Sequence, residues 1–200
     1  MKSTLLCYFL LSAAINADPG FAVADVNVRI ESLVASKAHL TNSALDVEGR
    51  NSNLDFIAIK NLAVTSWSPM IDQMDQLAQG GDGKRLVIQA LQVLNAEDFM
   101  SAFEKLVAKF EADTLSKELM EDALYPDWRM KTFFAYNFQH PRVILALGKI
   151  KSKLPQNDPL VETINDLLSG ERKASFESYR KAHEDTTEPP KPIIMLPPAQ

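Results

Sequence analysis

The 200-residue sequence has almost no cysteine. Cys7 is the only one, and it falls in an apolar stretch near the start. If that stretch is removed on export, no thiol remains to form a disulfide, to act as a nucleophile or to bind zinc or an iron–sulfur cluster. A secreted chain without disulfides is compatible with a reducing destination, such as the cytoplasm of another cell. The sequence therefore predicts a fold that is held together by packing alone.

Basic charge and long apolar runs are scarce as well. The chain has 21 Lys and Arg against 26 Asp and Glu, which gives a net charge of −5. Because no excess of cations is present to neutralise many phosphates, we expect no nucleic-acid partner. No stretch after residue 24 offers the ~20 apolar residues that a membrane-spanning helix needs. We therefore expect no stable insertion into a membrane.

Motifs for metal binding and catalysis are missing too. His39, His140 and His183 lie far apart and match no metal-ligand spacing, and no nucleophile elbow is present. Residues 80–84 (GGDGK) lack the first glycine and the Ser or Thr of a phosphate-binding loop, so we interpret them as a turn between helices. We predict no catalytic residues, no metal and no cofactor, and hence no enzyme. A hydrolase with a dispersed site is kept as an alternative.

The first 24 residues have the pattern of a cleavable signal peptide. Lys2 precedes the apolar run 5–15, which is too short to span a bilayer. Small residues before Asp25 suit cleavage after Ala24, with cleavage after Ala17 as a second choice. The predicted mature chain is about the length of one domain.

Three further regions follow the predicted signal peptide. Residues 25–53 are polar and predict a flexible leader with at most a short helix over 28–38. Residues 54–185 predict an all-α domain, a bundle or short stack of about seven or eight short helices. Residues 186–200 are rich in proline and predict an extended, mobile tail, in which residues 189–192 also fit a PxxP ligand.

Within the helical region, helix starts and ends can be assigned from capping residues. Asn95, His140 and Asp158 stand before apolar stripes, and Gly170 follows one. We also expect a new helix at Ser68 with Pro69 in its first turn. The stripes predict these core residues: Phe99, Ala102, Phe103, Leu106, Phe110, Leu115, Leu119, Met120, Ala123, Met130, Phe133, Phe134, Ile144, Leu147 and Ile150. The aromatics Trp128, Phe133, Phe134 and Tyr136 could also form a recognition face, but core packing is the better interpretation.

Two short motifs lie in the predicted leader. Lys37, Ala38, His39 and Leu40 form the first, and Asp46, Glu48 and Arg50 belong to an acidic stretch a few residues later. They resemble, in degenerate form, the Arg-x-Leu-Arg and Glu-Glu-Arg motifs of the RXLR effectors secreted by plant-pathogenic oomycetes. The first motif lacks the final arginine, and Gly49 replaces one glutamate of the second.

The helical region carries a second likeness to that family. Many of these effectors contain WY or LWY modules, in which an aromatic residue, Asn, three residues and Pro join two helices. Residues 136–141 (YNFQHP) are similar, and residues 97–99 and 154–168 resemble the flanking helices. Trp128 departs from the pattern, because Thr132 or Phe133 stands where tyrosine is usual.

The resemblance implies a function that composition and spacing do not show. It implies a protein that is secreted, enters the cytoplasm or nucleus of plant cells, and binds host proteins to suppress defence-linked cell death. An alternative is a bacterial periplasmic or extracellular helical-repeat adaptor without catalytic activity. Both interpretations expect a helical scaffold that acts through its outer surface.

Overall fold

The fold is all-α, as the sequence predicts. A computed structural model describes residues 19–35, 53–77, 80–124, 128–182 and 194–198, and in these ranges it contains helices and no strand. The helices are α1 (Pro19–Ala35), α3 (Leu54–Asp72), α4 (Gly81–Ala90), α5 (Ala96–Glu111), α6 (Lys117–Leu124), α7 (Trp128–Tyr136), α8 (Pro141–Lys153), α9 (Pro159–Ser169) and α10 (Glu171–Ala182). None of the helices described is long and apolar enough to cross a bilayer.

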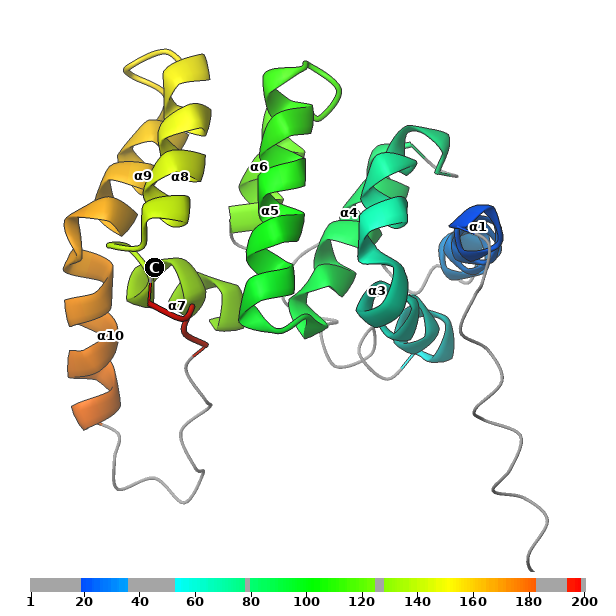
Figure 1. Cartoon of the computed structure of the whole chain (residues 1–200), viewed down its shortest axis with the longest axis horizontal. Coiled ribbons are helices and arrows are strands. Elements are labelled where there is room, and N and C mark those ends of the chain that lie inside the picture. The colour runs from blue at the N-terminus through cyan, green and yellow to red at the C-terminus, as the bar shows by residue number, and fades with distance from the viewer. Residues whose placement is uncertain (1–18, 36–52, 78–79, 125–127, 183–193, 199–200) are drawn as a thin grey trace, which may run out of the picture.

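Three pairs of helices stand side by side in a short stack. The pairs are α3 with α4, α5 with α6, and α8 with α9, and α5 contacts both α3 and α8 (Figure 1). Helix α1 packs on α3 at one end, while α10 packs on α9 and α7 at the other. The short helix α7 links the second pair to the third, lying below α8 and beside the lower end of α5 in the view of Figure 1.

Local capping explains where several helices begin and end. The side-chain oxygen of Asn95 accepts a hydrogen bond from the backbone N–H of Asp98 (3.0 Å), and that of Asp158 accepts from Leu160 N–H (2.9 Å). The ring of His140 accepts from Arg142 N–H (3.3 Å), next to a proline in the first turn. These contacts satisfy backbone donors that a helix start leaves unpaired. The predicted caps are therefore confirmed.

An aromatic cluster joins α5 to α7. Phe99 meets Phe133 edge-on with ring centroids 5.0 Å apart, and Phe103 lies 4.6 Å from Phe134. The four rings are 3 % exposed or less. Each buried ring removes a large apolar area from water, and tilted or edge-on pairs add to this. The predicted core position of these residues is confirmed, and the cluster fixes α7 against the stack.

Charged side chains of α5 bridge to α8 in a repeating pattern. Glu97, Glu104 and Glu111 follow one another at intervals of seven residues; the first two pair with Arg142 at 2.7 Å, and the third with Lys149 at 3.0 Å. Since the pairs advance in the same direction along both helices, α5 and α8 run parallel. Partly exposed pairs of this kind contribute only ~0–1 kcal/mol each, so they set the register of the two helices more than they stabilise the fold.

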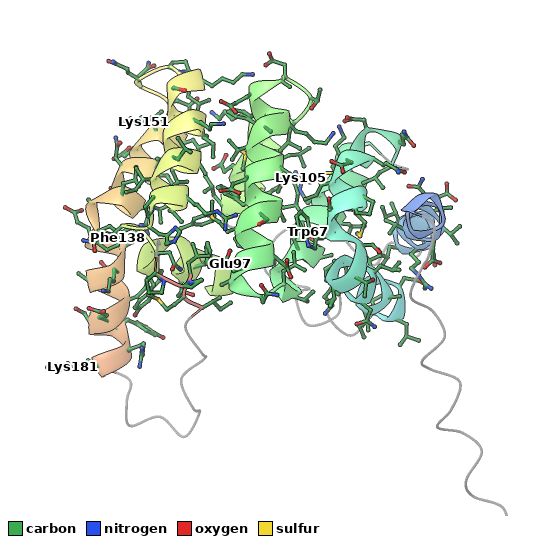
Figure 2. The ribbon with its side chains drawn as sticks, viewed as in Figure 1. Trp67, Glu97, Lys105, Phe138, Lys151 and Lys181 are labelled. Carbon is green, nitrogen blue, oxygen red and sulfur yellow. The ribbon has the colours of Figure 1, made fainter. Side chains whose placement is uncertain are left out.

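The opposite edge of α5 is basic and faces α3. Lys105 pairs with Asp72 at 2.7 Å and also donates to Ser68 Oγ at 2.7 Å, while Lys109 pairs with Asp75 at 3.0 Å. Figure 2 shows Lys105 and Trp67 between α5 and α3; the Lys105 ammonium lies 5.9 Å from the centroid of a Trp67 ring. Helix α5 therefore sorts its charges, with acidic groups toward α8 and basic groups toward the end of α3 and the turn that follows it.

The short helix predicted over residues 28–38 of the leader is present up to Ala35, but it starts earlier than predicted. Helix α1 begins at Pro19 and extends to Ala35, and its Val26, Ile30 and Leu33 are buried in the core. These three residues recur at helical spacing, but with only one of them per turn the apolar pattern is weak in the sequence. The leader is thus partly a packed helix, and that helix runs across the predicted cleavage position at Ala24.

The expected helix start before Pro69 is confirmed to within two residues. Helix α3 consists of two helical segments that meet at a kink at Ser66 (φ −141°, ψ 24°), and Pro69 lies in the first turn of the second segment, which ends at Asp72. One core assignment needs correction: Ile144 is 48 % exposed although we expected it in the core, where Val143 lies instead. This error arises because a helix's tertiary neighbours decide which face is buried.

Replacing Gly170 with alanine is expected to destabilise the fold. Gly170 has φ +83°, and an added Cβ would lie 2.9 Å from Cζ of Phe138. The left-handed conformation alone costs about 1–2 kcal/mol with a side chain. Gly148 in α8 is the matched control, since a Cβ there meets nothing within 4 Å. Gly148→Ala should stabilise by about 0.5–1 kcal/mol. Urea unfolding that ranks the two variants the other way would contradict the α9–α10 turn.

Asp158 is expected to make stability sensitive to acid. Its hydrogen bond with Lys117 (2.8 Å), followed by that from Leu160 N–H, lowers its pKa below the ordinary value of 3.8. A lowered pKa contributes stability above pH 3.8 that is lost as the pH falls through the folded-state value. Asp158→Asn keeps a capping oxygen but removes the charge, so its stability should fall less between pH 4.5 and pH 2.5, as measured by urea unfolding. Equal losses of stability in the unmodified chain and in Asp158→Asn would contradict the pair between Asp158 and Lys117.

Candidate functional site

Most residues of the predicted motifs lie in segments that the structure does not describe. Lys37, Ala38, His39 and Leu40, and likewise Asp46, Glu48 and Arg50, lie outside the described residues, as do Cys7, His183 and residues 189–192. His140 is a helix cap. In the ranges that the structure describes, no three His, Cys, Asp or Glu side chains gather in a way that could hold a metal ion.

The connection between α7 and α8 is where several elements meet. Three consecutive side chains of this connection contact three different partners. Tyr136 has the ammonium of Lys173 in α10 at 5.9 Å from its ring centroid, and Phe138, at the left of Figure 2, lies against Gly170 in the α9–α10 turn. Asn137, between them, contacts the C-terminal segment 194–198, which we call the tail segment. The connection thus brings together distant parts of the chain.

Asn137 is the one buried polar residue in the described part of the chain, with 4 % of its surface exposed. Its Nδ2 donates to the carbonyl oxygen of Phe133 (2.8 Å) and to that of Ile194 (2.9 Å), and its Oδ1 accepts from Leu196 N–H (2.8 Å). Burying an amide costs free energy unless its donors and acceptors find partners. Both donors of Asn137 are used, and two of its three bonds are to the tail segment.

The tail segment has the contact pattern of extended backbone, although it forms no β-strand. Asn137 contacts the carbonyl of residue 194 and the N–H of residue 196, so one side-chain amide holds two backbone groups on either side of Met195. The side chains alternate: Met195 is 55 % exposed, Leu196 is 7 % exposed, and Ile194 packs against the core. Alternation of this kind is typical of extended backbone. In Figure 1 the segment, in red, lies beside α7.

Proline residues favour this extended conformation before docking. Pro197 disfavours helical backbone at Leu196, and Pro198 does the same for Pro197. The segment therefore loses less conformational entropy when it binds. Residues 194–198 form no helix, as expected for this tail, but they are hydrogen-bonded and packed against the core instead of solvated.

The free energy of docking is expected to be small. Two hydrogen bonds contribute about 0.5–1.5 kcal/mol each and the burial of Leu196 contributes about 1.5–3 kcal/mol. Ordering the backbone of the segment costs about 1–2 kcal/mol per residue. The cost is lower at the two prolines, because their rings already restrict the backbone. The gain and the cost are of the same size. The tail segment therefore binds by a balance that one substitution can reverse.

A second surface feature lies on α8. Ile144 and Leu145 are 48 % and 62 % exposed, while Val143, Leu147 and Ile150 of the same helix are buried. The pairs between α5 and α8 hold this helix in place. Single exposed apolar side chains are common on protein surfaces. Here two of them are adjacent, on a helix whose opposite face is packed in the core, so they form a small and rigid apolar surface.

The sequence points to the α7–α8 connection but not to the tail segment that contacts it. The pattern of residues 136–141 carried the likeness to helical effector modules, whereas the contact between Asn137 and Leu196 spans 59 residues. A signal was present in the tail, where four apolar residues in succession, Ile193 to Leu196, stand between prolines. Such a run is unusual for a solvated tail, and it could have indicated docking.

Asn137→Ala is expected to release the tail segment. The change removes both bonds to the tail, while Phe133 O keeps its bond from the backbone N–H of residue 137 (3.0 Å). We expect a loss of about 1–3 kcal/mol in urea unfolding and faster hydrogen exchange at the Leu196 amide. Met195→Ala is the matched control, because this side chain points outward, and should change stability by less than about 0.5 kcal/mol. Slow exchange at Leu196 in the Asn137→Ala variant would contradict the assigned contact.

Comparison with known proteins adds no relative. No family model, no curated protein and no solved structure matches the chain. Its function must therefore be inferred from its own residues: the buried amide of Asn137, the tail segment that it holds, and the exposed apolar pair of α8.

Proposed function

We propose that this chain is a secreted effector that enters host plant cells and suppresses defence-linked cell death by binding host proteins, without a catalytic step. The observation that carries the proposal is the α7–α8 connection. The resemblance implies that an aromatic residue, Asn, three residues and Pro join two helices, and residues 136–141 join α7 to α8, with His140 and Pro141 opening the second helix.

The exposed surface of α8 favours action by binding. Ile144 and Leu145 present apolar area to solvent on a helix whose opposite side is packed in the core. A partner that covers them gains the burial of two large side chains, and the ordering cost is low because α8 is already fixed by Arg142 and Lys149. We assign this pair to the contact with a host protein.

A second candidate function is an adaptor of the helical-repeat type, in a bacterial periplasm or outside the cell. The stacking of three helix pairs and the parallel course of α5 and α8 favour it. This candidate also acts by binding, but it has no effect inside a plant cell. Expression in leaf tissue therefore separates the two candidates.

The test is transient expression of residues 25–200 in leaf tissue that is challenged with a cell-death elicitor. Starting at residue 25 keeps Val26, Ile30 and Leu33, the three core residues of α1. We expect less cell death than with a fluorescent protein alone. A variant with Ile144→Glu and Leu145→Glu should lose the effect, whereas Val64→Glu, at another exposed apolar residue (56 %), should keep it.

Two outcomes would contradict the proposal. Unchanged cell death at a protein level equal to that of the control would contradict the effector role. Equal loss of activity in the α8 double variant and in Val64→Glu, with both proteins accumulating normally, would contradict the assignment of the α8 surface as the contact. Immunoblots of the same leaf samples supply the protein levels.

A further inference from the structure

The contact between Asn137 and the tail segment has the chemistry of a peptide-binding site. The amide of Asn137 binds two backbone groups, which every extended peptide offers, and the residue between them, Met195, points to solvent. Selectivity can come from the flanking side chains, because Leu196 inserts into the core and Ile194 packs against it. The exposed Pro197 contributes by favouring extended backbone at Leu196. Backbone bonds for affinity and alternate side chains for specificity are the features of strand-type peptide recognition.

We propose that the surface around Asn137 is a binding site for an extended peptide with the pattern apolar, any residue, apolar, proline, and that the tail segment occupies it as an intramolecular ligand. The ligand is a segment of a partner protein with this pattern, which replaces the tail. The inference goes beyond the proposed function, because it adds to the α8 contact a second site and the chemistry of its ligand.

The way the tail is attached makes exchange possible. The tail segment follows the last described helix, α10, along the chain, so its release interrupts no described helix. A tethered ligand on a short connection competes at an effective concentration in the millimolar range. The tail therefore lowers the apparent affinity for a partner peptide without abolishing it, and a variant with a defective tail should bind the partner more tightly.

The test uses the full chain and a fluorescent peptide of residues 192–200 (PIIMLPPAQ), with binding followed by anisotropy. In the full chain with Leu196→Asp, the buried anchor becomes charged and the tail should leave the site. We expect saturable binding of the peptide to this variant, at least about tenfold tighter than to the unmodified chain.

Peptide variants supply a matched control. The same substitution is placed at two adjacent positions: Leu196→Asp in the peptide should abolish binding, whereas Met195→Asp should leave the affinity within about twofold, because the first side chain is buried and the second is exposed. Adding Asn137→Ala to the Leu196→Asp chain should weaken binding of the unmodified peptide at least tenfold, since both backbone contacts depend on the amide.

A second measurement keeps the inference testable if the Leu196→Asp chain does not fold. In the unmodified chain, an excess of unlabelled peptide should speed hydrogen exchange at the chain's own Leu196 amide, because the peptide displaces the tail. Unchanged exchange at a millimolar excess, or equal binding of the two peptide variants, would overturn the proposal. So would failure of a folded Leu196→Asp chain to bind the peptide.

These outcomes are distinct from those of the leaf assay. If the purified chain binds the peptide but cell death in leaves is unchanged, the effector role is contradicted and the proposed peptide site stands. Suppressed cell death by a chain that binds no peptide would overturn the site and leave the effector role intact.

Discussion

The packing of α7 against α5 is the constraint on which the C-terminal part of the described structure and the candidate site depend. Helix α7 has nine residues, and a helix of that length has little stability of its own in water. It is held by Phe133 and Phe134, which are fully buried against Phe99 and Phe103. Asn137 follows within one turn of these rings, so its position is fixed by the aromatic cluster. The placement of α8, of the α9–α10 turn and of the tail segment follows from that connection.

The charges of α5 add specificity to this arrangement. Apolar packing alone would tolerate sliding of neighbouring helices, because the hydrophobic effect has no direction. The three glutamates at intervals of seven residues allow one alignment with Arg142 and Lys149, and Lys105 and Lys109 do the same toward α3. A slip of one turn would separate several pairs at once. Weak pairs can therefore select a register although they contribute little to stability.

The parts of the fold that the sequence predicts correctly are local. Asn95 and Asp158 act on backbone groups two or three residues away, so a short window of sequence contains all the information that a cap needs. The apolar stripe of α5 is equally local, because each turn places its residue above the previous one. The all-α fold, the caps and most of the core follow from such windows.

The parts that the sequence does not predict depend on distant partners. Ile144 fits a helical stripe, but which face of α8 is buried is decided by α5 and α9, far along the chain. Helix α1 has one buried residue per turn and becomes part of the core only because α3 covers it. The candidate site follows the same rule: its pattern at 136–141 is visible in the sequence, and its contact with residues 194–196 is not.

A buried amide that depends on a chain terminus has a consequence for how the site behaves. If the tail segment leaves, the second donor and the oxygen of Asn137 lose their partners in a largely apolar setting, which costs free energy until something replaces them. Water can do so only in part, because the space left by Leu196 is lined by core residues and an apolar space holds water poorly. A ligand that offers a backbone carbonyl, a backbone N–H and an apolar side chain satisfies all of these groups together. The physical chemistry of the site thus favours an occupant with the features of an extended peptide, whether it comes from this chain or from another.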